Sequence, residues 1–435
     1  MTRILLLEAA GPESGALVAT ATAMGHQVHA ATTSDHHVNY GSDLRQLLSG
    51  CLITDFSRHE RACDDIVGYA RRVGADAVLT TNEYLTPMLA EVCAELGLPG
   101  NDPALATAAR NKADMSRQFA HRGVTAPHTH VLARENQVLR LCASGRLAFP
   151  CVVKPADGAG SAGVTVAQSA TEAIAAFRAA CELQGMYGMS LDPHVLVQEF
   201  IEGAEYSVES ITQNGVSTHL CLTRKIVTGG AHRVELGHGL PAFLPLEVEQ
   251  TVHGRVNSAI AAVGIRNGAS HTEVMLTPDG RCTVIEVGAR LGAGHIGFLI
   301  HHALGIDPWA ACLDVALGRP AQLAPTRDHY ATVRFLTNPH QGLLAAITGL
   351  PERSPQVPIV RVRKAVGEVV GGAKDNAGRL GNFVVVGPDQ QSVDDHADHL
   401  LAQVRIRVEP IERTSSHSAT IETRDDPAIS QADHG

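Results

Sequence analysis

One short segment, HTEVMLTPDGRCTVIEVGAR (residues 271–290), constrains the fold of this chain more than any other. Apolar residues alternate with other residues on both sides of the turn signal Thr-Pro-Asp-Gly, which predicts two antiparallel strands joined by a tight turn. A two-residue turn at Asp279 and Gly280 would place Glu273 opposite Glu286. A type I turn with Gly280 in a bulge would place Glu286 opposite Thr272 instead.

Two carboxylates that face each other across a strand pair lie about 5 Å apart and repel unless a cation lies between them. Mg²⁺ is commonly held by one or two carboxylates together with substrate phosphates. The hairpin is therefore interpreted as a platform for a nucleotide and its metal. The alternative is a pair of solvated glutamates at strand ends.

Length and composition indicate a large globular protein of two to four domains. The chain has 435 residues, of which 44% are hydrophobic and 18% charged, and no apolar run approaches the length of a membrane span. Its first apolar run is too short for the core of a signal peptide. The nine cysteines are scattered and never form C-x-x-C, which favours reduced thiols in the cytoplasm. A net charge of −10 argues against a nucleic-acid surface.

The N-terminal region, residues 1–108, alternates short apolar runs with segments of helical periodicity. The runs RILLLE, QVHAAT, CLITDF and DAVLTTNE are expected to be strands of a small parallel sheet. Asn82 and Glu83 follow the fourth strand, where open α/β sheets tend to bind ligands, so both are expected at the edge of a pocket.

Two lysines, Lys112 and Lys154, come before a glycine-rich loop in the chain. Lys112 lies on a helix expected over residues 106–122, and a buried strand ends at Lys154. The loop that follows contains Gly158, Gly160, Ser161 and Gly163 and leads into another strand, so it is not a Walker loop, which would lead into a helix. Its small residues would let backbone N–H groups close around phosphate oxygens. The alternative is a flexible hairpin loop without a ligand.

Acidic residues then recur on two adjacent strands. VLVQEFIEGAEYSVES (residues 195–210) reads as a strand that ends at Glu199, a turn at Gly203, and a second strand with Glu205, Ser207 and Glu209 on one face. Carboxylates beside a phosphate loop can accept hydrogen bonds from an adenine amino group and from ribose hydroxyls.

The order of these parts over residues 110–318 resembles the ATP-grasp superfamily. The motifs are A-R-N-K-A-D, V-V-K-P before the glycine-rich loop, V-Q-E-F-I-E-G, and E-V-M-L with I-E-V-G-A-R. The resemblance implies an α/β and α+β fold with five parts. These are an N-terminal Rossmann-like pre-ATP-grasp domain (1–108), a lobe with the phosphate loop (109–194), a lobe with the metal hairpin (195–320), a small C-terminal α/β lid (321–407) and a disordered tail (408–435).

The same resemblance implies where ATP and Mg²⁺ would bind. Lys112 and Lys154 would hold the phosphates under the loop, Glu199, Phe200 and Ile201 would meet the adenine edge, and Glu205 would meet the ribose. Glu273 and Glu286 would hold two Mg²⁺ ions, with Mn²⁺ as a possible substitute. Many members have Asn two residues after the second metal glutamate, whereas this chain has Gly288.

Within the superfamily the chain is similar to the L-amino acid ligases. The stretch HRVELGHGLPAFLP (residues 232–245) matches a substrate loop of that group, which implies that Glu235 and His238 help to hold the first amino acid. Arg290 would steady the acyl phosphate, and Gly292 would line the substrate site. The alternative for Glu235 and His238 is a role as loop surface residues.

The function expected from the resemblance is ATP-dependent joining of two amino acids through an acyl phosphate, in an enzyme that can be a homodimer. The cysteines, the net charge and the lack of a long apolar run add the expectation of a cytoplasmic protein that binds neither nucleic acid nor membrane. A second reading keeps the ATP chemistry but takes a non-amino-acid carboxylate, or a carrier-bound or thiol acceptor. A third, based on Gly288, is a nucleotide-binding protein without catalysis.

Overall fold

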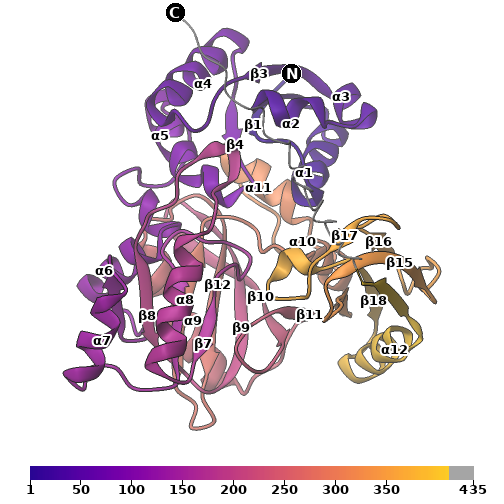
Figure 1. The fold of residues 1–435 in the computed structure, drawn as a ribbon. Helices are drawn as coiled ribbons and strands as arrows, with labels where there is room; N and C mark the ends of the chain where they lie inside the picture. The colour runs from indigo at the N-terminus through magenta and orange to yellow at the C-terminus, as the bar shows by residue number, and fades with distance from the viewer. Residues whose placement is uncertain (411–435) are drawn as a thin grey trace, which may run out of the picture.

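The computed structural model describes residues 1–410, and Figure 1 shows an N-terminal domain at the top, a two-lobed body below it and a C-terminal part beside the body. The tail expected over 408–435 lies outside the described residues except for its first three. Two of these, Val408 and Glu409, belong to the last strand, β19 (Arg405–Glu409), because this strand pairs with β15 (Gly342–Thr348). The C-terminal domain therefore ends at least two residues later than expected.

The N-terminal domain contains the predicted parallel sheet, with its strands in the order β3-β2-β1-β4. Its elements in chain order are β1 (Arg3–Leu7), α1 (Pro12–Ala23), β2 (Gln27–Thr32), α2 (Ser34–Val38), α3 (Ser42–Leu47), β3 (Leu48–Ile53), α4 (His59–Val73), β4 (Ala77–Leu79), the 3₁₀ helix η1 (Glu83–Leu85) and α5 (Thr86–Leu96). The central strand β1 is buried from Ile4 onward, as expected when helices cover both faces of a parallel sheet.

The first lobe of the body is a four-stranded antiparallel sheet in the order β5-β8-β6-β7. Its elements are η2 (Ala106–Ala109), α6 (Lys112–Arg122), β5 (Thr129–Leu132), α7 (Asn136–Ala143), β6 (Cys151–Pro155), β7 (Thr165–Ala167), α8 (Ala170–Cys181), η3 (Met186–Gly188) and β8 (Val195–Glu199). Strand β8 was expected in the second lobe, but it pairs with β5 and β6. The boundary between the lobes therefore follows Glu199.

The single helix expected over residues 106–122 is broken in two. The side-chain oxygen of Asn111 accepts hydrogen bonds from the backbone N–H groups of Ala113 (2.8 Å) and Asp114 (3.1 Å), so it caps α6. Helix α6 therefore begins at Lys112, and this lysine lies at a helix N-terminus rather than on the outer face of a helix.

The second lobe is built on an eight-stranded sheet in the order β13-β12-β9-β10-β11-β14-β18-β16. The elements up to residue 320 are β9 (Ala204–Gln213), β10 (Val216–Val227), β11 (Glu235–Leu240), α9 (Leu246–Ala262), β12 (Gly268–Leu276), β13 (Cys282–Gly288), α10 (Ile296–Leu304) and α11 (Pro308–Ala316). Helix α9 covers one face, where its Val252 and Val256 join Val274 and Val284 of the hairpin in one apolar core.

The C-terminal domain is continuous with this sheet. It supplies three of the eight strands, β14 (Tyr330–Leu336), β16 (Ile359–Val362) and β18 (Gly381–Gly387), and β15, β17 (Val369–Val370) and β19 form a small second sheet. Its helices are η4 (Asn376–Gly378) and α12 (Gln390–Gln403). Because β14 pairs with β11 of the body, the expected lid is joined to the second lobe by a ladder of backbone hydrogen bonds.

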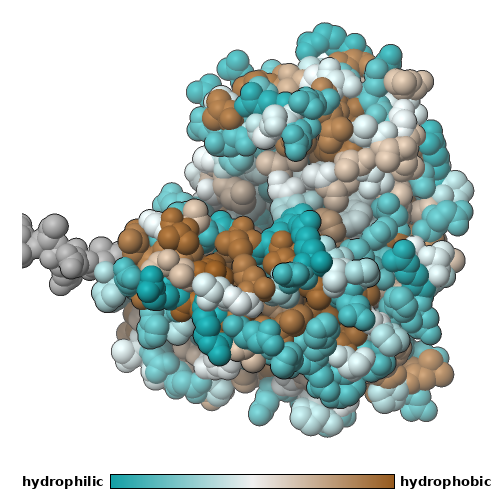
Figure 2. Space-filling view, turned by 90° about the vertical axis from the view of Figure 1, so that its right-hand side faces the viewer, coloured by the Kyte–Doolittle hydropathy of each residue, from teal (hydrophilic) through white to brown (hydrophobic). Residues whose placement is uncertain are grey.

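Figure 2 shows the face of the molecule that carries the C-terminal domain, and brown, hydrophobic surface gathers there below the N-terminal domain. The exposed apolar side chains of this domain include Leu343, Val362, Val366 and Val369. Across residues 1–410, no single helix is long and apolar enough to span a membrane, and α10 with α11 meets that test only as a pair bent by 106°.

Candidate functional site

A cavity between the two lobes gathers the residues that the sequence singled out. Gly163 and Gly292 are absent from its lining; the predicted ATP, metal and substrate residues that line it are Lys112, Lys154, Gly158, Gly160, Ser161, Glu199, Phe200, Ile201, Glu205, Glu235, His238, Glu273, Glu286 and Arg290. Glu83 of the N-terminal domain also lines the cavity, as expected. Asn82 does not, because its amide is turned to the hydroxyl of Tyr187 at 2.6 Å.

The hairpin β12–β13 brings its two glutamates face to face by a route that differs from the expected one. The two-residue turn is wrong: Thr277 and Arg281 close a three-residue loop in which Gly280 has φ +83°. This turn alone would place Glu286 opposite Thr272. A β-bulge between Val284 and Glu286 adds one residue to β13 and restores the pairing of Glu273 with Glu286.

The bulge also explains why Ile285 and Glu286, although consecutive, both line the cavity. Their neighbours Val284 and Val287 are fully buried in the core on the other face of the strand. The extra residue therefore lets the hairpin keep its apolar core while it presents a carboxylate to the cavity.

Lysine ammonium groups neutralise both hairpin carboxylates. Lys112 Nζ lies 2.9 Å from Glu286 Oε1 and donates a hydrogen bond to the carbonyl of Gly158 at 2.8 Å. Burial alone would lower the pKa of Lys112, but the carboxylates of Glu286 and Glu83 outweigh it and raise this pKa. Lys112 thereby connects the hairpin to the glycine-rich loop.

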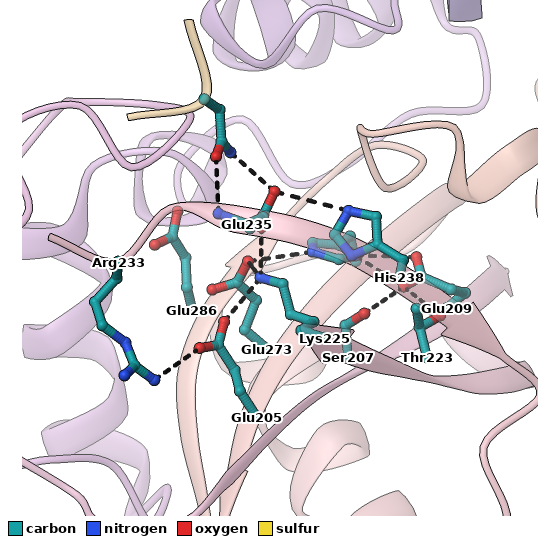
Figure 3. Close-up of polar contacts among 12 residues, drawn as sticks. Glu205, Ser207, Glu209, Thr223, Lys225, Arg233, Glu235, His238, Glu273 and Glu286 are labelled. Atoms are coloured by element: carbon teal, nitrogen blue, oxygen red, sulfur yellow. Dashed lines mark hydrogen bonds and ion pairs between the residues drawn. The ribbon is translucent and has the colours of Figure 1, made fainter. Parts of the chain in front are cut away.

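Sequence reasoning missed Lys225 of β10, which is the centre of a buried charge cluster (Figure 3). Its Nζ contacts Glu273 and lies 3.0 Å from Glu205 Oε1 and 2.9 Å from Glu235 Oε1. Burial would lower the pKa of Lys225, but the three carboxylates raise it well above its usual value. One signal for it was present in the sequence: Lys225 lies in a run of residues with the alternating pattern of a β-strand.

The glycine-rich loop lies above these cations. Gly160 and Ser161 both have φ of 62°, and Gly163 has φ of 70°, so the loop bends back through left-handed conformations that glycine favours. At Gly158 an added Cβ would lie 2.5 Å from Pro155 Cγ. Lys154 is buried at the end of β6 beneath the loop, and burial lowers its pKa. Two lysines and small residues thus surround the space expected for phosphates.

At the other end of the cavity the lining is more apolar. Val152, Val166, Met275 and Ile285 lie there together with the 199–201 segment that follows β8. Glu205, which was expected to meet a ribose, is held by Lys225 and lies 3.7 Å from the guanidinium of Arg233. Apolar side chains thus lie in the cavity lining together with charged groups, a combination that suits a purine nucleoside.

Glu235 on β11 is fixed by residues of the C-terminal domain that the sequence did not indicate. Arg379 donates to Glu235 Oε2 at 2.6 Å, and the side-chain amide of Asn376 donates to the same oxygen at 2.8 Å. The backbone N–H of Asn376 also donates to the carbonyl of Gly160 in the phosphate loop at 3.1 Å. Arg379 and Asn376 are separated from Glu235 by more than 140 residues, so no local pattern could reveal them.

His238 is buried beside Glu235, with 3.7 Å between its Nε2 and Glu235 Oε2. Burial lowers the pKa of His238 to about 3, so its ring is neutral at pH 7. Within residues 1–410 neither ring nitrogen has a hydrogen-bond partner. A buried nitrogen without a partner suits a polar group of a ligand.

Arg290 is held by the N-terminal domain. It contacts Glu83 through two nitrogens, with Nε at 3.1 Å from Glu83 Oε2, and Arg110 lies 3.8 Å from the same carboxylate. Burial alone would raise the pKa of Glu83, but Arg290, Lys112 and Arg110 lower it to about 2. Glu83 thus orients the guanidinium at the point where the N-terminal domain meets the cavity.

Gly292 has a packing role. An added Cβ at this position would lie 2.8 Å from His271 Nδ1 and 2.9 Å from Glu209 Oε2, so only glycine fits against this pair. Gly292 is absent from the cavity lining, so its packing against His271 and Glu209, and not contact with a substrate, accounts for the glycine at this position.

The donor set of the hairpin fits a hard divalent cation. Glu273 and Glu286 face each other, both line the cavity, and both now depend on lysine ammonium groups for neutralisation. Carboxylate oxygens beside a phosphate site are the ligands that Mg²⁺ and Mn²⁺ use in nucleotide-binding proteins.

Comparisons with known proteins identify three consecutive domains. An ATP-grasp N-terminal domain matches residues 18–100, an ATP-grasp domain matches residues 147–298, and the L-amino acid ligase C-terminal domain 2 matches residues 334–409. The last match covers most of the strands that extend the eight-stranded sheet beyond β11.

Among curated proteins, dapdiamide A synthase of Enterobacter agglomerans is 31% identical over 47% of this chain and 48% of its own length. Alanine–anticapsin ligase of Bacillus subtilis is 26% identical over 61% of this chain and 59% of its own length. The chain thus spans about half the length of these two relatives. Among solved structures, an L-amino acid ligase from Bacillus licheniformis has the same fold, with a TM-score of 0.79, 22% identity, and coverage of 94% of this chain and 99% of that one.

Proposed function

Because this chain is a member of the ATP-grasp superfamily, we propose that it is an ATP-dependent ligase that joins the carboxyl group of one amino acid to the amino group of another. The observation that carries this proposal is the cavity between the lobes. It combines two lysines under a glycine-rich loop, two facing carboxylates and a fixed arginine, which are the groups that phosphorylation of a carboxylate requires.

The chemistry proceeds in two steps. A carboxylate oxygen of the first amino acid attacks the γ-phosphorus of ATP, and the bond between this phosphorus and the β-phosphate oxygen breaks. ADP departs, and the amino acid becomes an acyl phosphate. The amine of the second amino acid then attacks the carbonyl carbon, loses a proton, and expels inorganic phosphate. A free carboxylate is too weak an electrophile for this attack, and the phosphate provides the good leaving group.

Each charged residue has a role in these steps. Lys112 and Lys154 neutralise the phosphates of ATP, and Arg290 neutralises the transferred phosphoryl group and the developing oxyanion. Glu273 and Glu286 would hold the divalent cations, which would supply positive charge to offset that of the phosphates. Glu83 positions Arg290, because it holds the guanidinium through two nitrogens.

We place the first amino acid beside Glu235 and His238. The carboxylate of Glu235 suits an ammonium group, and the two unpartnered nitrogens of His238 suit a further polar contact. The relative named alanine–anticapsin ligase and the L-amino acid ligase domain at residues 334–409 favour amino acids over other carboxylic acids as the substrate class.

The experiment that tests the proposal is ADP release with ATP, Mg²⁺ and all pairs of the common amino acids, run beside the Glu286→Gln variant. We expect specific pairs to stimulate ADP release, a dipeptide mass to appear, and the variant to lose at least about 100-fold in rate, because removal of a group that stabilises transition-state charge costs that much. Nucleotide binding without ADP release for any pair would contradict the amino-acid assignment. ADP release that the variant retains would contradict the role of Glu286.

A further inference from the structure

Gly288 lies two residues after Glu286, where many ATP-grasp proteins have Asn, and the structure shows what faces this position. Gly288 is paired with His271 across the hairpin, and Glu273 and His271 are two residues apart on one strand and so lie on the same face. An added Cβ at Gly288 would lie 3.8 Å from Arg290 Cγ, so the glycine leaves space on the face that also carries the imidazole of His271 and the carboxylate of Glu273.

The ring of His271 is held in one orientation. Its Nδ1 lies 2.9 and 3.0 Å from the two oxygens of Glu209, a carboxylate that is 1% exposed and also accepts a hydrogen bond from Ser207 at 2.7 Å. Figure 3 shows Glu209 and Ser207 together on the side of the cluster away from Glu286. Gly292 lies against the His271–Glu209 pair, because a Cβ there would lie 2.8 Å from His271 Nδ1.

With Nδ1 committed to Glu209, the remaining nitrogen of His271 faces Glu273. Nε2 lies 3.3 Å from Glu273 Oε1. Two neighbouring ligands of one octahedral ion, each at about 2.1 Å, lie about 3 Å apart, so this spacing suits a shared cation. A carboxylate on the far nitrogen is also the usual partner of a metal-binding histidine, because it fixes the tautomer that leaves the other nitrogen free.

We propose that His271 Nε2 is a protein ligand of the divalent cation held by Glu273, in the place that Gly288 leaves vacant, with Glu209 as its positioning residue. This inference rests on the proposed function, since it concerns the metal that accompanies the nucleotide. Imidazole is a softer ligand than carboxylate, so the site favours Mn²⁺ over Mg²⁺ more than an all-oxygen site does. The competing explanation is that a proton on Nε2 bridges His271 to Glu273.

The test is pulsed electron paramagnetic resonance of Mn²⁺ bound to the full chain with ADP. Directly bound imidazole produces nitrogen couplings, so we expect ¹⁴N modulation in the wild type that becomes ¹⁵N modulation when histidine alone is ¹⁵N-labelled. His271→Gln is expected to abolish this signal and to weaken Mn²⁺ binding by about 10-fold or more. His238→Asn is the matched control, because this second buried histidine of the cavity contacts Glu235 and should leave the signal intact.

The labelling experiment shows whether a histidine binds the metal even if His271→Gln does not fold, and persistence of the coupling in His238→Asn assigns it to His271, since these are the two histidines that line the cavity. Bound Mn²⁺ and ADP without histidine nitrogen coupling would overturn the inference and leave the ligase proposal standing. Failure of the chain to bind Mn²⁺ and ADP together would overturn both.

Discussion

Three carboxylates converge on one ammonium group in this protein, and single residues of that cluster determine its charge balance. Lys225 is 8% exposed and contacts Glu205, Glu235 and Glu273, which come from three different strands. Without it, three like charges would remain close together in a partly desolvated site. The three carboxylates of this cluster repel one another, and a bound divalent cation can reduce that repulsion.

We therefore expect Lys225→Met to destabilise the ligand-free protein by about 3 kcal/mol, since removal of one partner leaves buried charges uncompensated. Part of this loss should return with ADP and Mg²⁺, because the metal supplies positive charge to Glu273. Urea unfolding with and without the ligands measures both effects. Lys364→Met is the control, because Lys364 pairs with Glu368 on the surface and should change stability by less than about 1 kcal/mol. Equal unfolding midpoints for the two variants would contradict this account.

At the scale of elements, two segments distant in sequence close the cavity together. The segment around η4 contacts the phosphate loop through the backbone of Asn376 and contacts β11 through its side chain. The side chain of Asn376 also accepts a hydrogen bond from the backbone N–H of Glu235 at 3.3 Å. The position of Glu235 is thus coupled to that of the loop that covers the phosphates.

Asn376→Ala is expected to raise the KM of the first amino acid by about 10-fold, which corresponds to the loss of about one hydrogen bond to a charged group. The KM of ATP should change less, because the contact with Gly160 comes from the backbone, which alanine retains. Steady-state kinetics with each substrate varied in turn separates the two effects. Asn136→Ala, at an exposed helix start, serves as the control. An equal rise in both KM values would show that Asn376 supports the loop rather than Glu235.

At the scale of the whole molecule, the N-terminal domain is fixed to the second lobe by a shared apolar core. Leu17 and Val18 of α1 pack in one cluster with Trp309 and Leu313 of α11. A polar contact accompanies this core: the indole nitrogen of Trp309 donates to Glu13 Oε2 at 3.1 Å. Figure 1 shows α11 directly below the N-terminal domain. This interface places Glu83 against Arg290.

The interface should make stability depend on pH through Glu13. Burial, the largest cause, raises the pKa of Glu13 to about 7, and its Oε1 has no partner within residues 1–410. Between pH 4.5 and 7 the native state keeps a proton that the unfolded chain releases, so the free energy of unfolding falls as pH rises, by up to about 3 kcal/mol. Glu13→Gln should remove this contribution and make the protein more stable than the wild type at pH 8. Chemical denaturation of both proteins from pH 4.5 to 8 tests this, and parallel profiles would contradict it.

Binding of nucleotide between the lobes should also stabilise the whole molecule. At ADP and Mg²⁺ concentrations 100 times Kd, the unfolding free energy rises by about 2.7 kcal/mol through mass action. Thermal unfolding with a ligand titration measures this gain. We expect the gain to be smaller for Glu286→Gln, which removes one metal carboxylate, and an unchanged gain would contradict the metal-binding role of the hairpin.

The sequence by itself determined the features that are local in the chain. The parallel sheet, the loop before β7 and the lysine before the loop all follow from alternation, turn residues and motif order over short distances. It did not determine the turn of the hairpin, because two turn types fit the same residues. The pairing of Glu273 with Glu286 depends on a bulge at Ile285. Sequence reasoning also misplaced β8, because pairing between strands decides membership of a sheet.

Only the tertiary structure decided the partners of the charged residues. Lys225, Asn376, Arg379 and the pairing of Glu83 with Arg290 depend on strands and domains that are far apart in the chain. Electrostatic interactions act through space, so two residues hundreds of positions apart can share a buried charge cluster without any local signal. The motifs therefore locate the cavity, whereas the folded arrangement specifies which groups in it hold one another in position.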